Sequence, residues 1–91
     1  MLNLVWRGSA LDDLRQITSH IAERNVAAAH RLQADIESCA ERLAEHPFMY
    51  RPGRTLGTRE AVVRPNYIIV YRVTAEAVEI VNLVHARQCY P

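Results

Sequence analysis

The sequence contains no lysine, and all eleven of its basic residues are arginine. Its three glycines, at positions 8, 53 and 57, are too scattered to form a phosphate-binding loop. No apolar run approaches the roughly 20 residues that a membrane span needs, and residues 1–7 lack the features of a secretory signal. We therefore expect a cytoplasmic protein that neither enters a membrane nor uses a glycine-rich nucleotide site.

Patterns typical of metal and nucleophile sites are also missing. The four histidines and two cysteines show none of the short paired spacings of zinc sites, and no serine lies in a recognisable nucleophile elbow. Cys39 falls at an apolar position of a predicted helix, which indicates a core residue. A cytosolic setting argues against a disulfide between Cys39 and Cys89. The sequence predicts no metal and no cofactor.

What is present is the composition of an ordinary globular domain, with 49% hydrophobic and 23% charged residues. A length of 91 residues suits a single domain spanning 1–91. Residues 1–50 carry five arginines against seven acids, a sum of −2, whereas residues 51–91 carry six arginines against three acids, a sum of +3. A basic second half favours an acidic partner, although so small an excess also fits a solvated surface.

The first half of the sequence predicts a strand followed by two helices. Apolar residues alternate over residues 2–6, which indicates a short strand. Ser9 then has the features of an N-cap for a helix over about 10–24, and Asn25 those of a cap for the next helix. In this second helix, apolar residues recur at helical spacing from Leu32 to Leu43. The helix is predicted to end at His46-Pro47, because the residue before a proline disfavours the helical conformation. Two consecutive amphipathic helices predict an antiparallel hairpin.

The second half predicts a loop and then three strands. Residues 47–57 are rich in proline, glycine and arginine, which indicates a loop long enough to be functional. Residues 58–64, 67–73 and 78–85 have strand composition, and the short links between them predict antiparallel neighbours. The third of these strands is apolar enough to be central. The order of elements predicts an α+β fold with the helices against one sheet face.

A polar set accompanies these late strands and is the main candidate for function. Its members are Arg59, Arg64, Arg72, His85, Arg87 and Tyr90. Antiparallel pairing could bring several of them to one end or face of the sheet, and histidine with arginine suits binding or cleavage of a phosphodiester. The same residues also allow a plainer interpretation, in which Arg59 and Glu60 or Arg72 and Glu79 form surface ion pairs and His85 is structural.

One pattern is specific enough to suggest a family. P-N-Y-I-I-V-Y-R-V, a short turn, V-E-I-V-N-L-V and then H-A-R-Q-C-Y-P closely resemble the ParE branch of the ParE/RelE superfamily. These proteins are toxins of bacterial type II toxin–antitoxin modules and are often described as plasmid stabilisation proteins. The resemblance extends over the whole chain. It implies a helical hairpin packed on a four-stranded, mainly antiparallel sheet, and a hetero-oligomer with a small cognate antitoxin that is ParD-like or similar.

The resemblance leaves two targets open, since ParE-like toxins inhibit DNA gyrase whereas RelE-like toxins cleave mRNA on the ribosome. The RelE-like pattern uses lysines on the first late strand and an arginine after the tyrosine of the next. This chain has no lysine, and Ile68 follows Tyr67. Arginine cannot replace lysine in proton transfer, because its pKa above about 12 keeps it charged. The sequence therefore favours a non-enzymatic toxin that inhibits gyrase by binding.

Within this interpretation, the resemblance and the charge pattern give a set of residues for binding the target: Arg59, Arg64, Arg72, His85 and Arg87. The first alternative is a ribosome-dependent mRNA endoribonuclease, for which the catalytic candidates are Arg59, His85, Arg87 and Tyr90. The second alternative is a degenerate toxin that retains only antitoxin binding.

Overall fold

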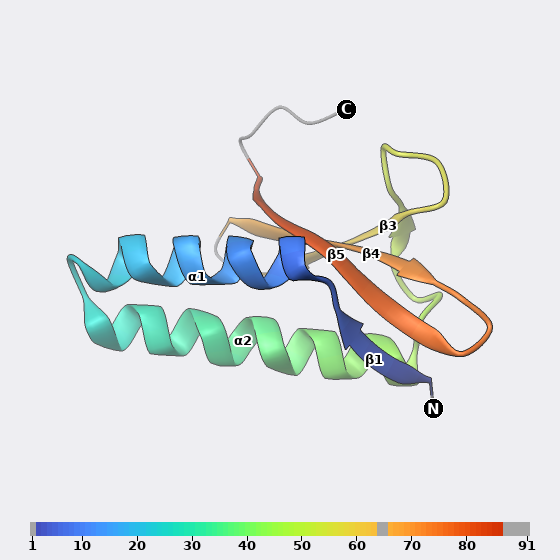
Figure 1. The fold of residues 1–91 in the computed structure, drawn as a ribbon, viewed down its shortest axis with the longest axis horizontal. Coiled ribbons are helices and arrows are strands. Elements are labelled where there is room, and N and C mark those ends of the chain that lie inside the picture. The colour runs from blue at the N-terminus through green and yellow to red at the C-terminus, as the bar shows by residue number, and fades with distance from the viewer. Residues whose placement is uncertain (1, 64–65, 87–91) are drawn as a thin grey trace.

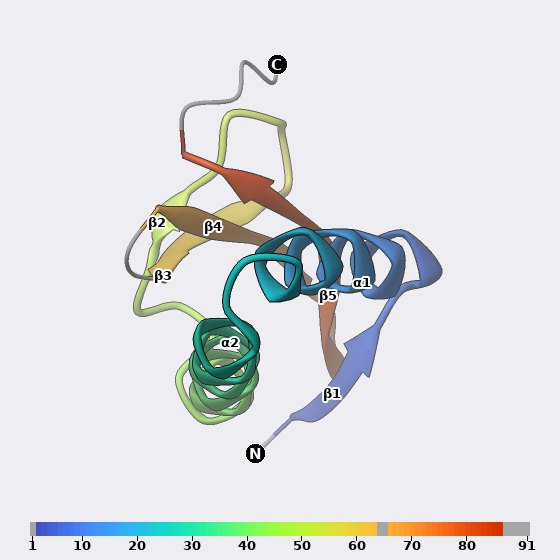
Figure 2. The same ribbon diagram turned by 90° about the vertical axis from the view of Figure 1, so that its left-hand side faces the viewer.

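A five-stranded sheet covered on one face by two helices forms the protein in the computed structural model, which describes residues 2–63 and 66–86. The elements are β1 (Asn3–Trp6), α1 (Gly8–Ala22), α2 (Val26–Glu45), β2 (Arg51–Pro52), β3 (Arg59–Val63), β4 (Tyr67–Val73) and β5 (Ala77–His85). The strand order is β1-β5-β4-β3-β2, and Figure 1 shows α1 lying along β5 with α2 beside it. Figure 2 looks along the two helices and shows β2, β3 and β4 above α2, with β1 at the lower right. The predicted α+β fold is confirmed.

The helical hairpin forms as the apolar stripes predict, but one of its two predicted caps is wrong. Asn25 caps α2, since its side-chain oxygen accepts a hydrogen bond from the Ala28 N–H at 3.0 Å. Ser9 does not cap α1, because that helix begins at Gly8 with Arg7 as its N-cap residue. The Ser9 hydroxyl instead donates to the Val81 carbonyl on β5 at 2.6 Å. Ser9 therefore binds a residue 72 positions away instead of the backbone at the start of its own helix.

The sheet has one strand more than the four expected. Arg51 and Pro52, within the segment predicted to be a loop, pair with Glu60 and Arg59 as β2. Strands β3, β4 and β5 are antiparallel neighbours, as the short links predict. In addition, β2 pairs antiparallel with β3, and β1 runs parallel to β5. The third late strand, β5, is indeed an interior strand. The additional strand, β2, has only two residues and forms by pairing with β3. Two residues are too few to show a periodicity in the sequence.

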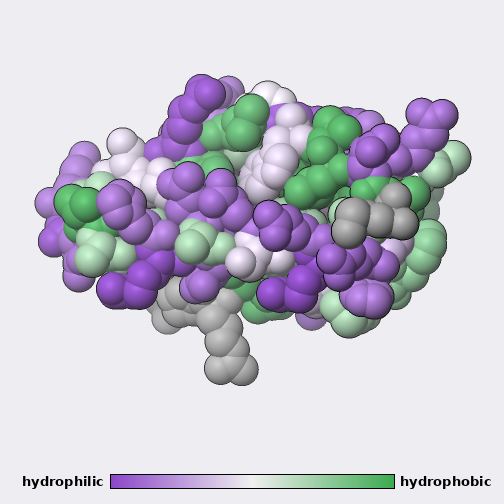
Figure 3. All heavy atoms as spheres, turned by 90° about the horizontal axis from the view of Figure 1, so that it is seen from below, coloured by the Kyte–Doolittle hydropathy of each residue, from purple (hydrophilic) through white to green (hydrophobic). Residues whose placement is uncertain are grey.

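The core lies between the helices and the facing side of the sheet. Ile36 and Leu43 of α2 are fully buried against Ile69, Tyr71 and Ile80 of the sheet. Burying a large apolar side chain stabilises a fold by about 1.5–3 kcal/mol. Cys39 belongs to this core, as predicted, and burial raises the pKa of its thiol. Neither helix in residues 2–63 and 66–86 is long and apolar enough to cross a membrane. Seen from the α2 side, the surface is mostly hydrophilic, with separate hydrophobic areas (Figure 3).

A bulge in β5 determines which of its side chains face the core. Tyr71 pairs with Ile80 but Val70 pairs with Asn82, so Val81 is an extra residue in the ladder. Before the bulge the buried positions are Val78 and Ile80, and after it the buried position is Leu83. The bulge therefore shifts the alternation by one residue and keeps apolar side chains directed at the helices.

Candidate functional site

The structure separates the predicted polar residues rather than gathering them. Arg59, Arg72 and His85 are in the described part of the chain, whereas Arg64, Arg87 and Tyr90 lie outside the described residues. Arg59 is opposite Tyr71 and His85 is opposite Tyr67, both on β4. Four strand residues separate these positions by about 13 Å. Arg59 and His85 therefore mark opposite ends of the sheet. We name them the loop end, around Arg59 and Tyr71, and the hollow end, around Tyr67 and His85.

At the loop end, polar groups bind the segment that precedes β2. The Arg59 Nη1 donates to the Tyr50 carbonyl at 2.8 Å, and the Arg59 guanidinium carbon lies 5.0 Å from the centre of the Phe48 ring. The Tyr71 hydroxyl donates to the Pro47 carbonyl at 2.9 Å. Tyr71 is fully buried, and this burial raises the pKa of its phenol to about 12. These contacts hold residues 47–50 against the end of the core.

The sheet face away from the helices carries two carboxylates, Glu60 and Glu79, and the exposed Arg72. Glu60 is only 4% exposed and accepts hydrogen bonds from Arg51 Nη2 at 3.0 Å and from the Arg54 backbone N–H at 3.2 Å. Arg72 is exposed and stands opposite Glu79, which binds Arg7 at 2.7 Å. The sequence suggested that Glu60 pairs with Arg59 and Glu79 with Arg72. The structure gives both carboxylates arginine partners from other elements.

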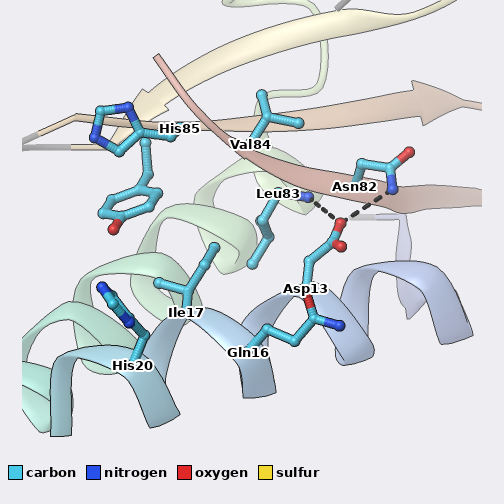
Figure 4. A pocket seen from close by; sticks show the side chains of 9 residues that line it. Asp13, Gln16, Ile17, His20, Asn82, Leu83, Val84 and His85 are labelled. Atoms are coloured by element: carbon cyan, nitrogen blue, oxygen red, sulfur yellow. Dashed lines mark hydrogen bonds between the residues drawn. The ribbon is translucent and has the colours of Figure 1, made fainter. Parts of the chain in front are cut away.

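At the hollow end, two aromatic rings stand at the mouth of a cavity. The His85 and Tyr67 ring centres are 5.2 Å apart and the rings meet edge to face at 81°. A hollow of about 350 Å³ lies between α1 and β5 and is lined by both rings together with side chains that include Ile17, His20 and Leu83. Figure 4 shows His20 and His85 at one end of this hollow and Asp13 at the other. A second hollow, of about 390 Å³, begins beside the same two rings and extends over α2.

Asp13 is the residue of this site that sequence reasoning missed. Its Oδ2 accepts hydrogen bonds from the Asn82 side-chain amide and from the Leu83 backbone N–H, both at 3.0 Å (Figure 4). The only local signal for it is its spacing of four from Ser9, which places both side chains on one face of a helix. Within residues 2–63 and 66–86, no group of three or more histidine, cysteine or acidic side chains could hold a metal ion.

Comparison with known proteins identifies the family. Residues 4–90 match the family model described as the ParE toxin of the type II toxin–antitoxin system parDE. The Y4kP protein of Sinorhizobium fredii is 40% identical over 87 residues, which cover 94% of this chain and 90% of the relative. Toxin RelE2 of Caulobacter vibrioides is 38% identical over 86 residues, which cover 94% and 97% of the two chains.

Solved structures agree on the fold. A chain of the chromosomal ParDE toxin–antitoxin system from P. aeruginosa superposes with a TM-score of 0.84 at 21% identity, over 96% of this chain and 98% of that one. A chain of the RelBE2 toxin–antitoxin complex from Mycobacterium tuberculosis gives 0.64 at 23% identity, over 92% and 96%. Fold and sequence together define a type II toxin of the ParE/RelE superfamily. More narrowly, the chain belongs to the ParE toxin family, which confirms the resemblance seen in the sequence.

Proposed function

We propose that this toxin inhibits DNA gyrase by binding to it in the cytoplasm, and that a cognate antitoxin, ParD-like or similar, neutralises it in a hetero-oligomer. The match to the ParE family model over residues 4–90 supports the gyrase target. The toxin–antitoxin complexes among the proteins of the same fold support an antitoxin partner.

Of the residues proposed to contact gyrase, His85 lies at the hollow end, half-buried beside Tyr67. Arg64 and Arg87 belong to the same proposal but lie outside the described residues. Arg72 adds an exposed positive charge on the sheet face away from the helices. Arg59 has a different role in this proposal, because its guanidinium is bound to the Tyr50 carbonyl and covers the Phe48 ring. It stabilises the loop end and affects the target indirectly.

The separation of Arg59 from His85 is the observation that favours binding over cleavage. General acid–base catalysis needs both proton-transfer groups within hydrogen-bond reach of the reacting atoms. Arg59 and His85 are about 13 Å apart along the sheet, and the chain has no lysine that could act with His85. These two residues of the ribonuclease set therefore do not form one catalytic centre.

A ribosome-dependent mRNA endoribonuclease is the second candidate, and the relative named toxin RelE2, 38% identical to this chain, favours it. In that case His85 is the candidate base, with Arg87 and Tyr90 as further catalytic candidates that follow it closely in the sequence. A degenerate toxin that only binds antitoxin is the remaining alternative.

Two assays on the purified toxin separate these functions. Gyrase supercoiling of relaxed plasmid is measured with increasing toxin, and ribosome-bound mRNA is examined for cuts at the same concentrations. We expect loss of supercoiling with intact mRNA, and restored supercoiling when antitoxin is added first. Cut mRNA with normal supercoiling would overturn the proposal in favour of the endoribonuclease. No effect in either assay, together with harmless expression, would identify a degenerate toxin.

A further inference from the structure

Within residues 2–63 and 66–86, no strand pairs with the second half of β5 on the side where β1 pairs with its first half. β1 pairs with β5 only along residues 77–80, and the last backbone bond between them runs from the Arg7 N–H to the Ile80 carbonyl at 3.0 Å. The chain then enters α1 at Gly8. In the described part of the chain, Asn82 to His85 pair with β4 alone. An unpaired edge of this kind leaves backbone groups that need other hydrogen-bond partners.

Two side chains of α1 supply those partners. The Ser9 hydroxyl donates to the Val81 carbonyl at 2.6 Å, and the Asp13 Oδ2 accepts from the Leu83 N–H at 3.0 Å. Four residues of helix rise about 6 Å, and two residues of strand rise about 6.6 Å. The spacing of Ser9 and Asp13 thus matches the spacing of the two backbone groups on β5. The bulge at Val81 is what turns these groups toward α1, since before it the Ile80 carbonyl faces β1.

Asp13 makes the stronger of the two attachments. Its Oδ2 also accepts from the Asn82 side-chain amide at 3.0 Å, so one carboxylate oxygen fixes two consecutive residues of β5. Hydrogen bonds to a charged acceptor are stronger than those between neutral groups. In Figure 4 the Asp13 carboxylate lies below β5 at the inner end of the hollow, and His85 lies two residues beyond Leu83 at its mouth.

We infer that Ser9 and Asp13 form a clamp that takes the place of a strand beside β5, and that this clamp positions His85 for toxicity. Asp13 is a positioning residue, since it acts through β5 and not by touching the target. Leu83 and His85 point to the same face of the strand, two residues apart. Fixing Leu83 therefore sets the place of the His85 ring against Tyr67. The part of the inference that concerns toxicity rests on the proposed function, in which His85 contacts the target.

Four variants test the clamp in the full-length toxin. Asp13→Ala removes both acceptor bonds, while Asp13→Asn keeps an oxygen that can accept them. Asp12→Ala is the matched control, because Asp12 is exposed on the same helix and its ion pair, 3.4 Å long, is with Arg15. Ser9→Ala removes only the bond to Val81. The readouts are amide hydrogen exchange at Leu83, the NMR signal of the His85 imidazole, growth arrest on induction and antitoxin binding.

We expect Asp13→Ala to speed exchange at Leu83 by roughly 10- to 100-fold, which is the range for losing a hydrogen bond to a charged group. The His85 signal should shift because the Tyr67 ring no longer lies at a fixed angle to it. Growth arrest should weaken while antitoxin still binds. Asp13→Asn should restore all of these properties, Asp12→Ala should leave them unchanged, and Ser9→Ala should cause smaller changes of the same kind.

Equal Leu83 exchange and an equal His85 signal in Asp13→Ala and Asp12→Ala would overturn the clamp. Full toxicity of Asp13→Ala with a displaced His85 signal would overturn the role in positioning. If Asp13→Ala fails to fold, Ser9→Ala decides, and unchanged exchange at Leu83 in that variant overturns a two-point clamp. Exchange and the imidazole signal need no target. If the toxin does not inhibit gyrase, the proposed function is refuted. Hydrogen exchange at Leu83 and the His85 signal would still test the clamp.

Discussion

Tyr67 and Tyr71 lie on the same face of β4, four residues apart, in very different surroundings. Tyr71 is fully buried, its hydroxyl donates to the Pro47 carbonyl, and Arg59 stands opposite it on β3. Tyr67 is half-buried, lines both hollows and meets the His85 ring edge to face. Only Tyr71 is wholly enclosed by the core.

The contrast between these two ends separates structural polar groups from groups available for recognition. At the loop end, guanidinium, phenol and carboxylate groups are bound to backbone atoms or ion-paired within the protein. At the hollow end, the Tyr67 and His85 rings line an open hollow. Binding pockets are commonly concave and lined mainly by apolar side chains, with a few polar groups that fix the orientation of the ligand. We therefore expect substitutions at the loop end to change stability, and those at the hollow end to change toxicity.

The largest expected effect is a loss of stability at alkaline pH that arises from Tyr71. In the unfolded chain a tyrosine ionises near pH 10, but burial raises the pKa of Tyr71 to about 12 in the folded protein. Between these values the unfolded state loses a proton that the folded state keeps, so the free energy of unfolding falls as pH rises. A difference of about two pKa units corresponds to a fall of about 3 kcal/mol.

Chemical denaturation at pH 8 and at several values up to pH 12 measures this fall. Tyr71→Phe should lack that part of the alkaline fall while losing about 1 kcal/mol at pH 8, because the Pro47 carbonyl loses its donor. Tyr67→Phe, on the same strand, is the control and should retain the fall. An alkaline fall of full size in Tyr71→Phe would show that another group is responsible.

The next effect concerns toxicity at the hollow end. His85→Ala should weaken inhibition of gyrase by about 30-fold, the equivalent of a binding hot spot of about 2 kcal/mol. Its unfolding free energy should change little, since the ring is only half-buried. Inhibition is measured by titration in the supercoiling assay, and folding by circular dichroism.

Arg59→Ala provides the comparison from the loop end. It should lose about 1–2 kcal/mol of stability, because the Tyr50 carbonyl loses its donor and the Phe48 ring loses its cation. The folded fraction should inhibit gyrase as strongly as the unaltered toxin. Loss of inhibition in fully folded Arg59→Ala would mean that the loop end also contacts the target.

Glu60→Ala should lower stability by a similar amount, about 1–2 kcal/mol. The buried carboxylate holds the Arg51 side chain and the Arg54 backbone N–H, so its loss frees β2 and the following loop. The cost stays moderate because the Arg51 side chain is 62% exposed and can be hydrated instead. Limited proteolysis should show faster cleavage within residues 51–58. Glu60→Gln keeps an acceptor for the Arg54 N–H and should be cut more slowly than Glu60→Ala.

The sequence predicts those parts of the fold that depend on neighbouring residues. The helices follow from apolar spacing, the cap at Asn25 from its own side chain, and β4, with the bounds Tyr67–Val73, from its strand composition. The errors involve partners on other elements of the fold. Ser9 has a local capping role available but binds Val81, 72 residues away. β2 exists only through its pairing with β3.

The candidate site is less predictable for the same reason. The residue types at its hollow end, above all His85, are visible in the sequence. Their arrangement depends on the register between strands, which places Arg59 and His85 at different ends. The contribution of Asp13 depends further on a bulge that no local pattern announces. The sequence thus shows which residue types are present. The separation of the loop end from the hollow end depends on how the strands pair.

The smallest predicted effect tests whether burial explains the importance of Glu60. Glu79 lies on the same sheet face and also binds one arginine, Arg7, at 2.7 Å, but the side chains of this pair are 27% and 42% exposed. An ion pair with that much access to water contributes about 0.2–1 kcal/mol. Glu79→Ala should therefore cost less than Glu60→Ala, and its cost should shrink further in high salt. Thermal unfolding of both variants at low and high ionic strength measures the difference. Equal costs would show that the face away from the helices is uniform and that the buried contacts of Glu60 give the loop end no special stability.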